Sequence, residues 1–378
     1  MKTLVTGGAG FIGSHLVEAL LARGDDVCAL DNLSSGRKRN LLAIRRHPLF
    51  RLEVGDVRDA GRTRELVAEA DVIYHLAAHV GVRRIVGQAL ECLLNNLQGT
   101  MVLLEEAARA GKRTMVFSSS EVYGRGKGEP LTEEEDLGFG APNVLRWSYA
   151  AGKAADEALA LAYHAERGLP VTVVRCFNTC GPRQSDRYGM VVPTFVRQAL
   201  ADAPLTVHGD GQQRRCFSYV GDVVRGVIML EQSRAAVGEV FNVGNDEEVS
   251  ILDLAHRVIR TTGSRSSVSL VSYEHAFGGA FEDIRRRIPS LEKIRTYVGY
   301  EPRVSLDGIL EMTIASQWPD STQRPDQVRR SAPSQRPDRA LRPDPTQGSG
   351  GSGQARTSES TWHDCAEATD SAPDRCTG

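Results

Sequence analysis

The glycine-rich segment near the N-terminus constrains the fold of this chain more than any other feature. Residues 1–31 contain a short apolar run, a loop with Gly7, Gly10 and Gly13, an apolar helical pattern and a second apolar run that ends at Asp31. Gly7 permits a tight strand-to-helix turn, Gly10 lets a pyrophosphate approach the backbone, and Gly13 lets the helix pack against the strand. The N–H groups of the helix N-terminus then face the phosphates. This order of elements predicts a dinucleotide-binding unit.

Asp31 predicts which dinucleotide binds. It ends the second apolar run, at the distance from the glycine loop at which a carboxylate accepts hydrogen bonds from an adenosine ribose. The same carboxylate would repel a 2′-phosphate. The sequence therefore favours NAD over NADP.

Strand-like and helix-like segments alternate along the first 180 residues, which indicates βαβ units and a parallel sheet with helices on both faces. We therefore predict an α/β fold with a Rossmann-type, doubly wound parallel sheet in residues 1–180, with residues 216–245 interleaved into it. Ligands of such sheets bind at the carboxyl ends of the strands. The expected strands are residues 3–6, 27–30, 50–54, 71–76, 114–118 and 171–176, and the expected helices are residues 12–23, 61–69, 94–110 and 148–167.

The pattern changes after residue 180. We predict a smaller mixed α/β lobe in residues 181–318, which binds substrate and closes over the cofactor domain. Its first expected elements are a helix at 191–201, a strand at 205–208, a turn at 209–211 and a helix at 221–232. Residues 319–378 hold seven of the 16 prolines and one aromatic residue. Such a segment cannot bury enough apolar surface to offset its ordering entropy, so we predict a disordered tail.

Composition narrows the class of protein. The net charge of −2 gives no support for nucleic acid or an acidic membrane as a partner. No apolar run approaches the roughly 20 residues of a membrane span, and no signal-peptide pattern precedes the first strand. The seven cysteines are scattered without zinc-site spacing, and we expect Cys28 and Cys176 to be buried free thiols. We therefore expect a cytoplasmic protein without a metal site.

Tyr149 and Lys153 are candidate catalytic residues, because their spacing puts both on one face of a helix. A neighbouring ammonium favours the phenolate and would lower the pKa of Tyr149, which makes this residue a candidate general base. Ser119, Ser120 and Glu121 follow a predicted strand at the expected ligand crevice. They supply hydroxyl donors and one titratable acid.

Residues 1–318 resemble the extended short-chain dehydrogenase/reductase family of NAD-dependent nucleotide-sugar epimerases, dehydratases and decarboxylases. The segments that carry the resemblance are TGGAGFIG (6–13), LDNLSSG (30–36), GDVRD (55–59), YHLAA (74–78), NNLQGT (95–100), SSSEVYG (118–124), YAAGK (149–153), RCFNTCGPRQ (175–184) and GDGQQRRCFSYVGD (209–222).

The resemblance implies roles for individual residues. The implied cofactor-binding residues are Gly7, Gly10, Phe11, Ile12, Gly13, Asp31, Asn32, Asp56, Val57, Leu76, Ala77, Ala78, Asn96 and Lys153. The implied substrate-binding residues are Asn178, Arg183, Val192, Arg215 and Arg287. In this family the tyrosine removes the proton of the sugar 4-hydroxyl while the C4 hydride goes to NAD.

Two features favour a decarboxylase within the family. Ser120-Glu121 matches the Thr-Ser-Glu of UDP-glucuronate decarboxylases, with Ser119 in place of the threonine. Residues 278–290 resemble the substrate-lobe segment of those enzymes, and Arg287 falls where they have an arginine near the substrate carboxylate. We therefore expect conversion of UDP-glucuronate to UDP-xylose or its 4-keto pentose, carried out by Tyr149, Lys153, Ser119, Ser120, Glu121 and Arg287.

Other functions stay open at this point. Residues 79–84 are more similar to the loop of 4-epimerases, so a UDP-hexose 4-epimerase is the second hypothesis and a nucleotide-sugar 4,6-dehydratase the third. A dinucleotide-binding regulator without turnover is a fourth, against which the intact Tyr149 and Lys153 argue. The resemblance also implies a homodimer in which helices near 94–110 and 148–167 form a four-helix bundle. Apolar stripes are expected on these helices at Leu103, Leu104, Ala107 and Ala108, and at Ala154, Ala158, Leu161 and Ala162.

Overall fold

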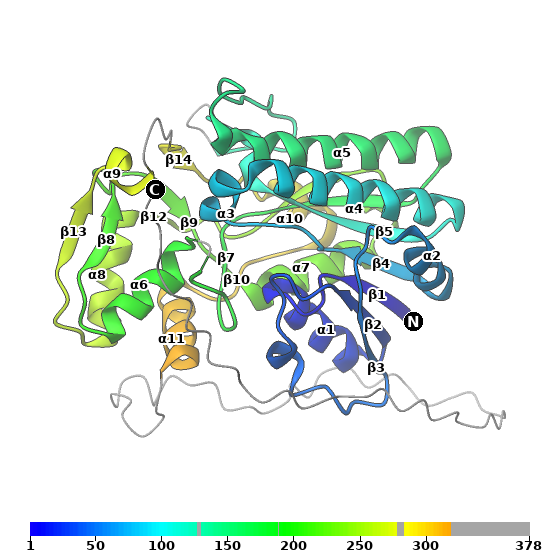
Figure 1. Ribbon diagram of the computed structural model, residues 1–378, viewed down its shortest axis with the longest axis horizontal. Coiled ribbons are helices and arrows are strands. Elements are labelled where there is room, and N and C mark those ends of the chain that lie inside the picture. Colours follow the sequence, from blue (N-terminus) through cyan, green and yellow to red (C-terminus); the bar gives the residue numbers. More distant parts are fainter. Residues whose placement is uncertain (127–129, 188, 278–282, 319–378) are drawn as a thin grey trace, which may run out of the picture. The chain divides into compact units, whose positions relative to one another are not determined.

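A seven-stranded parallel sheet forms the centre of the computed structural model, which describes residues 1–126, 130–187, 189–277 and 283–318 (Figure 1). The strand order is β11-β6-β5-β4-β1-β2-β3, and every neighbouring pair is parallel. The strands are β1 (Lys2–Thr6), β2 (Asp26–Asp31), β3 (Phe50–Val54), β4 (Val72–His75), β5 (Arg113–Ser119), β6 (Val171–Cys176) and β11 (Val240–Val243).

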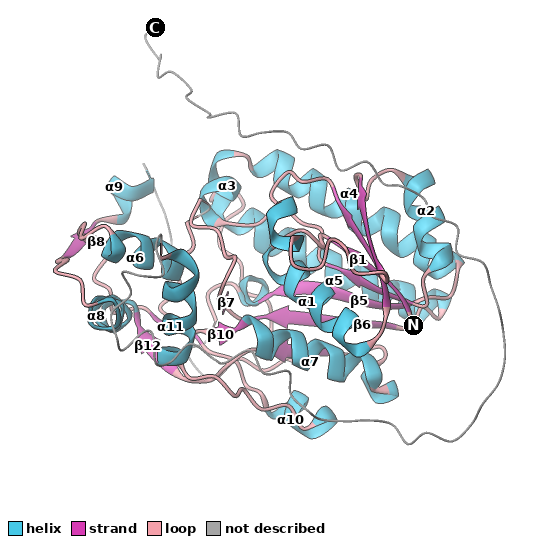
Figure 2. Ribbon diagram, turned by 90° about the horizontal axis from the view of Figure 1, so that it is seen from below, coloured by secondary structure: helices cyan, strands magenta, loops and turns pink. Residues whose placement is uncertain are grey.

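Helices cover both faces of this sheet, as Figure 2 shows from below. One face packs on α1 (Phe11–Arg23) and α7 (Val220–Gln232), and the other packs on α2 (Ala60–Glu69), α4 (Ala89–Arg109) and α5 (Ser148–Arg167). Successive strand residues point to opposite faces, so Val5 belongs to the first core and Leu4 to the second. The predicted doubly wound α/β fold is confirmed.

The strand order creates a crevice at the carboxyl edge of the sheet. β1 lies between β2 and β4, so the chain moves outward from β1 in one direction and then in the other. Ligands of open α/β sheets bind where the order reverses in this way. The ends of β1, β2 and β4, together with β5 and β6, therefore carry the residues that matter for binding.

Periodicity predicted the regular elements of this half within a few residues. The short elements carried no periodic signal and were not predicted: the helix α3 (Val82–Gly87) and the 3₁₀ turns η1 (Lys38–Leu41), η2 (Ser120–Tyr123) and η3 (Leu145–Trp147). Two of these, η2 and η3, border the site described below.

Residues after Cys176 form several small sheets and a separate core. The helices α6 (Val191–Leu200), α8 (Ile251–Thr262) and α11 (Leu306–Gln317) pack together with β8 (Leu205–His208). β8 pairs with β13 (Val268–Val271), β7 (Thr179–Cys180) with β10 (Ser218–Tyr219), and β9 (Arg214–Cys216) lies between β12 (Glu248–Ser250) and β14 (Arg286–Arg287). The short helices α9 (Tyr273–Phe277), α10 (Glu292–Val298) and η4 (Arg234–Ala236) complete the described elements.

Parts of this second half return to the large sheet. β11 extends the sheet beside β6, and α7 covers one face together with α1. Leu291 and Ile294 pack into the same core.

The remaining predictions concern the tail, membrane-spanning helices and the cysteines. The predicted tail at 319–378 lies outside the described residues. Within those residues, no helix is long and apolar enough to cross a lipid bilayer. Cys28, Cys92, Cys176, Cys180 and Cys216 are free thiols, but Cys28 and Cys176 are half-buried rather than buried as expected.

Candidate active site

The glycine loop between β1 and α1 forms a cradle for phosphates. Gly7 has φ +73°, and a Cβ there would lie 2.9 Å from the Ala77 nitrogen. A Cβ on Gly13 would overlap the carbonyl oxygen of Gly7. No side chain caps the N-terminus of α1 at Gly10, and no acidic residue lies in its first turn. This geometry fits a dinucleotide pyrophosphate, because the helix presents N–H groups and a positive dipole end without a competing carboxylate.

Asp31 lies at the end of β2 beside this loop. Its carboxylate accepts hydrogen bonds from the backbone nitrogens of Ala9 at 2.9 Å and Leu33 at 2.8 Å. Burial raises the pKa of Asp31, and the two N–H donors lower it in part. Nearby, the side chain of Asn32 donates to Asp56 at 3.0 Å. The acid thus sits where the adenosine ribose of a dinucleotide would lie.

A single cavity of about 510 Å³ connects the glycine loop with the second half of the chain. Most of the predicted site residues line it, from the carboxyl ends of the strands and from the small sheet around β9. The predicted residues in the lining are Gly7, Gly10, Phe11, Ile12, Gly13, Asp31, Asn32, Asp56, Val57, Leu76, Ala77, Ala78, Ser119, Ser120, Glu121, Tyr149, Lys153, Asn178, Val192, Arg215 and Arg287.

Two predicted residues, Asn96 and Arg183, are not in the lining. Asn96 accepts from the backbone nitrogen of His79 at 2.7 Å and donates to its carbonyl at 3.1 Å, so it holds the loop after β4. Arg183 donates to Glu18 of α1 at 2.6 Å and to Ser14 at 3.2 Å. The sequence did not reveal this acceptor, because Glu18 lies far from Arg183 along the chain.

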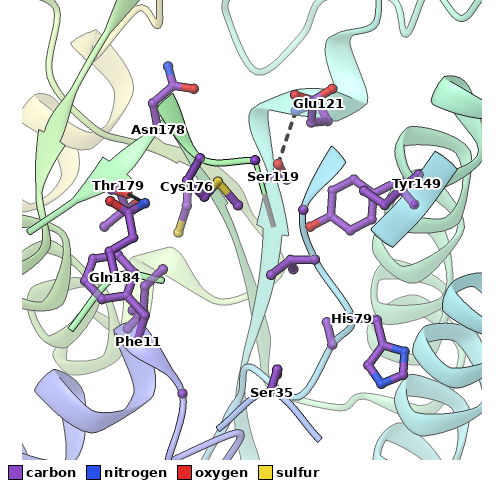
Figure 3. Close-up of a pocket in the computed structure, with 18 of the residues that line it drawn as sticks. Phe11, Ser35, His79, Ser119, Glu121, Tyr149, Cys176, Asn178, Thr179 and Gln184 are labelled. Atoms are coloured by element: carbon purple, nitrogen blue, oxygen red, sulfur yellow. Dashed lines mark hydrogen bonds between the residues drawn. The ribbon is translucent and has the colours of Figure 1, made fainter. Parts of the chain in front are cut away.

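Tyr149 and Lys153 project from α5 as their spacing predicted. Lys153 donates to the Phe117 carbonyl at 3.0 Å and to Asp156 at 3.1 Å. Figure 3 shows the Tyr149 hydroxyl directed into the cavity, across from Cys176 and Asn178. The expected lowering of the Tyr149 pKa is not found. Burial raises this pKa, and the opposing effect of Lys153 is smaller.

Glu121 enters the cavity from η2, the 3₁₀ turn after β5. The hydroxyl of Ser119 accepts from the backbone nitrogen of Glu121 at 3.3 Å and caps this turn (Figure 3). Ser120 is buried. The turn therefore fixes where the Glu121 carboxylate points.

Two arginines bind the Glu121 carboxylate, one at each oxygen. Arg146 Nη1 donates to Oε2 at 2.7 Å, and Arg287 donates to Oε1. Arg287 also donates to the side-chain oxygen of Asn178 at 2.9 Å. Burial raises the pKa of Glu121, but Arg287 and Arg146 lower it more, so the pKa lies well below its ordinary value. Glu121 is therefore an anion in this structure.

Arg215 lies beside Arg287 because β9 and β14 are parallel with these two residues paired. Arg215 donates to Asp283 at 2.8 Å, and Asp283 also accepts from the Tyr273 hydroxyl at 2.6 Å. Burial and the charge of Arg287 lower the pKa of Arg215 to about 10, so it remains charged at neutral pH. This side of the cavity is therefore cationic.

Sequence reasoning missed Arg146, Tyr273 and Asp283. The sequence did carry a signal for Arg146, because it precedes Tyr149 by about one helical turn, a spacing that puts two residues on one helix face. Asp283 and Tyr273 had none. The two arginines before Arg287 lie outside the cavity lining: Arg285 is exposed and paired with Asp210, and Arg286 is half-buried and binds Glu248 at 3.0 Å.

The doubly wound sheet, the glycine cradle, the acid after β2 and the Tyr-Lys pair on α5 define a dinucleotide-binding enzyme of the short-chain dehydrogenase/reductase class. The chain belongs to the NAD dependent epimerase/dehydratase family, whose model matches residues 3–244. The cofactor is therefore NAD, as predicted, and the residues around the cradle fit it.

Individual relatives cover most of the chain. A protein from Bacillus cytotoxicus named UDP-N-acetyl-alpha-D-glucosaminuronate decarboxylase is 39% identical over 84% of this chain and 97% of its own length. The UDP-glucuronic acid decarboxylase 1 of Xenopus tropicalis is 38% identical over 83% of this chain and 71% of its own.

Solved structures agree with the fold. The UDP-glucuronic acid 4-epimerase of Bacillus cereus, in complex with UDP-glucuronic acid and NAD, has a TM-score of 0.76 and 30% identity over 84% of this chain and 98% of its own. The dTDP-glucose 4,6-dehydratase DesIV of Streptomyces venezuelae, with NAD bound, has a TM-score of 0.76 and 34% identity over 84% of this chain and 96% of its own.

Proposed function

We propose that this protein catalyses the NAD-dependent decarboxylation of UDP-glucuronate to UDP-xylose or its 4-keto pentose. The observation that carries the proposal is the arginine pair around Glu121. A buried guanidinium that already binds a carboxylate in the cavity has the charge and geometry to bind the carboxylate of a sugar acid. The curated relatives named as decarboxylases of UDP-uronic acids support the same assignment.

The charges around the cavity suit such a substrate. Three arginines line this part of the cavity, Arg146, Arg215 and Arg287, and the carboxylates of Glu121 and Asp283 lie among them. Guanidinium groups that line a cavity attract an anionic ligand. We assign the diphosphate to Arg215, and the sugar carboxylate to Arg287.

The residues of the site can carry out the chemistry. When bound, NAD would supply the acceptor for the hydride from C4, and its reduced form would supply the hydride that returns to C4. Tyr149 takes the proton of the 4-hydroxyl, and oxidation at C4 makes a β-keto acid. As CO₂ leaves, its bonding electrons delocalise into the 4-ketone, where the Tyr149 and Ser119 hydroxyls stabilise the enolate. Glu121 assists delivery of the proton to C5.

Two observations favour alternatives. The Bacillus cytotoxicus relative is named for the N-acetylated uronic acid, so UDP-N-acetylglucosaminuronate is the second candidate substrate. Epimerases and dehydratases are among the structural neighbours, so 4-epimerisation and 4,6-dehydration are the alternative reactions.

Product mass separates these possibilities. The purified protein would be incubated with NAD and, separately, with UDP-glucuronate, UDP-N-acetylglucosaminuronate and UDP-glucose. Loss of the mass of CO₂ from UDP-glucuronate, or of CO₂ and two hydrogens when the 4-keto pentose is released with NADH, supports the proposal. Unchanged mass with altered stereochemistry, or loss of the mass of water from UDP-glucose, would instead support an epimerase or a dehydratase.

We also propose that the protein is a homodimer built through α4 and α5. These helices lie along each other on one face of the sheet (Figure 1). The expected stripe on α4 proves to face inward, because Leu103, Leu104 and Ala107 are buried in the core. A different stripe on α4 is exposed and apolar, and α5 presents small residues beside it. The exposed α4 residues are Leu90, Leu94 and Met101, and those of α5 are Ala158 and Ala162.

The proposed roles of the domains follow the sequence prediction: residues 1–180 and 216–245 bind NAD, and residues 181–318 bind the nucleotide sugar.

We further propose a cytoplasmic location. It is supported by the five free cysteines of the described residues, which suit a reducing compartment.

A further inference from the structure

The two arginines on Glu121 come from different parts of the fold. Arg146 is the middle residue of η3, just before α5, and its guanidinium lies 4.9 Å from the centre of the Trp147 ring. Arg287 lies in a two-residue strand of the small sheet and divides its donors between Glu121 and Asn178. Because each arginine binds its own carboxylate oxygen, either one can leave without displacing the other.

A substrate carboxylate would compete with Glu121 for Arg287. The guanidinium of Arg287 is buried, and its Nε has no partner among the described residues. When Arg287 turns to the substrate, Glu121 Oε1 loses its cation and faces a second carboxylate. Both the burial of Glu121 and the like charge then favour the protonated form. Arg146 still holds Oε2 and keeps the carboxyl group in place.

The other charged groups around Glu121 do not prevent this uptake. Among the described residues, Arg287 of β14 and Arg146 of η3 act on Glu121, and Glu121 acts on Tyr149 of α5 and Arg215 of β9. Arg215 is bound to Asp283, and burial raises the pKa of Tyr149, so its phenol is neutral until it loses the proton and becomes the base. The transfer of Arg287 is thus the main change in charge at Glu121.

We propose that binding of a uronic acid substrate moves Arg287 from Glu121 to the substrate carboxylate and thereby loads Glu121 with the proton that is later given to C5, while Arg146 acts as the positioning residue. The inference rests on the proposed decarboxylation and deepens it. The balance is complete: the bond between C5 and the carboxylate breaks, CO₂ leaves, and the proton on Glu121 Oε1 forms the new C–H bond. Decarboxylation consumes one proton, and this step takes it up at binding.

Proton uptake on binding tests the proposal directly. NAD-loaded Tyr149→Phe protein, in which turnover should be greatly slowed, would be titrated calorimetrically with UDP-glucuronate in buffers of different ionisation enthalpy. We expect uptake of about one proton per bound ligand near neutral pH. UDP-glucose, which lacks the carboxylate, should cause almost none. The double variant Tyr149→Phe/Glu121→Gln should bind UDP-glucuronate without uptake.

Turnover measurements separate the role of Arg146 from folding. Arg146→Met should lower kcat about tenfold or more with a small change in KM, and Arg146→Lys should restore part of it. Arg285→Met, an exposed arginine two residues from Arg287, is the matched control and should leave kcat unchanged.

Three results would overturn the inference: no proton uptake, uptake that persists in the Glu121→Gln background, or Arg146→Met with wild-type kcat. Failure of the proposed function looks different, because wild-type protein would then release no CO₂ from UDP-glucuronate.

Discussion

Glu121 shows how single side chains set the chemistry of this cavity. A buried carboxylate is costly unless it is paired, and here two arginines and a capped turn provide the pairing. The same contacts make the protonation of Glu121 sensitive to ligand binding, because a ligand that binds one of the two arginines removes a positive charge from beside this carboxylate. Variants at single positions should therefore separate binding from catalysis.

Arg287→Met should discriminate between charged and neutral nucleotide sugars. A charge-assisted pair contributes about 1.5–3 kcal/mol, so kcat/KM for UDP-glucuronate should fall about 10–100-fold. Binding of UDP-glucose, measured by calorimetry, should change much less. Arg285→Met serves again as the control. Equal losses for both ligands would show that Arg287 does not bind the carboxylate.

Tyr149→Phe should reduce turnover by about 10²–10⁴-fold, the usual size of a general-base contribution, while NAD binding stays near the wild-type value. Because burial raises the pKa of Tyr149, wild-type kcat/KM should also rise with pH above neutrality. Tyr163→Phe, on the same helix outside the cavity lining, should leave turnover unaltered. A variant with nearly normal turnover would remove Tyr149 from the mechanism.

Sequence alone predicted most of the side chains in the cavity and fewer of their partners. Spacing within one segment is readable, so Tyr149 and Lys153 were found together on one helix face. Pairings between distant segments are not. Glu18 captures Arg183 from 165 positions away, and Asp283 reaches Arg215 across 68. The pKa of Tyr149 was misjudged for a related reason, since burial depends on packing that no local pattern shows.

Among the structural elements, the junction of β1, β4 and α4 depends on a buried histidine. His75 lies between the hydroxyls of Thr6 at 2.8 Å and Thr100 at 3.2 Å. Burial, with a smaller effect of Lys153, lowers the pKa of His75 to about 3. The folded protein therefore keeps this ring neutral at a pH where the unfolded chain binds a proton.

This difference predicts how stability depends on pH. The unfolded chain gains a proton at His75 below pH 6.5, and the folded protein gains it only near pH 3. The free energy of unfolding should therefore fall by about 1.4 kcal/mol per pH unit between these values from this residue alone. In urea unfolding, His75→Gln should lower stability at pH 7 but show a shallower decline below pH 6.5. The exposed His256→Gln should keep the wild-type slope; an unchanged slope in His75→Gln would contradict the assignment.

A second prediction at the level of elements concerns the glycine loop between β1 and α1. Gly13→Ala places a methyl group against the Gly7 carbonyl, so we expect a loss of about 1–3 kcal/mol and weaker NAD binding. Gly61→Ala is the matched control in α2, because the nearest atom to its new Cβ, on Asp59, lies 3.4 Å away. Denaturant midpoints and NAD titrations would measure both. Wild-type values in Gly13→Ala would show that the loop can move aside.

At the scale of the whole molecule, we predict that two copies of the chain form a homodimer. The exposed stripe on α4 suits a twofold contact, and light scattering should give twice the 41.1 kDa chain mass. Leu94→Glu should shift the protein to monomers, while Leu270→Glu, at a more exposed leucine of β13, should not. A wild-type monomer at micromolar concentration would exclude the dimer. The fold itself was predictable from alternating periodicities, but the inward or outward facing of each stripe was not, since core and interface share one composition.

The pairing of β9 with β14 has an evolutionary consequence. Arg287 faces the cavity because it lies opposite Arg215, while Arg286, opposite Arg214, turns to Glu248. In a strand, a shift by one position reverses every side chain. A change in segment length that slides Ile288 opposite Arg215 would thus remove the arginine from the cavity without any substitution, whereas the opposite slide would put Arg286 in its place. Changes of segment length, as much as point mutations, can therefore convert an enzyme of this type from charged to neutral sugars.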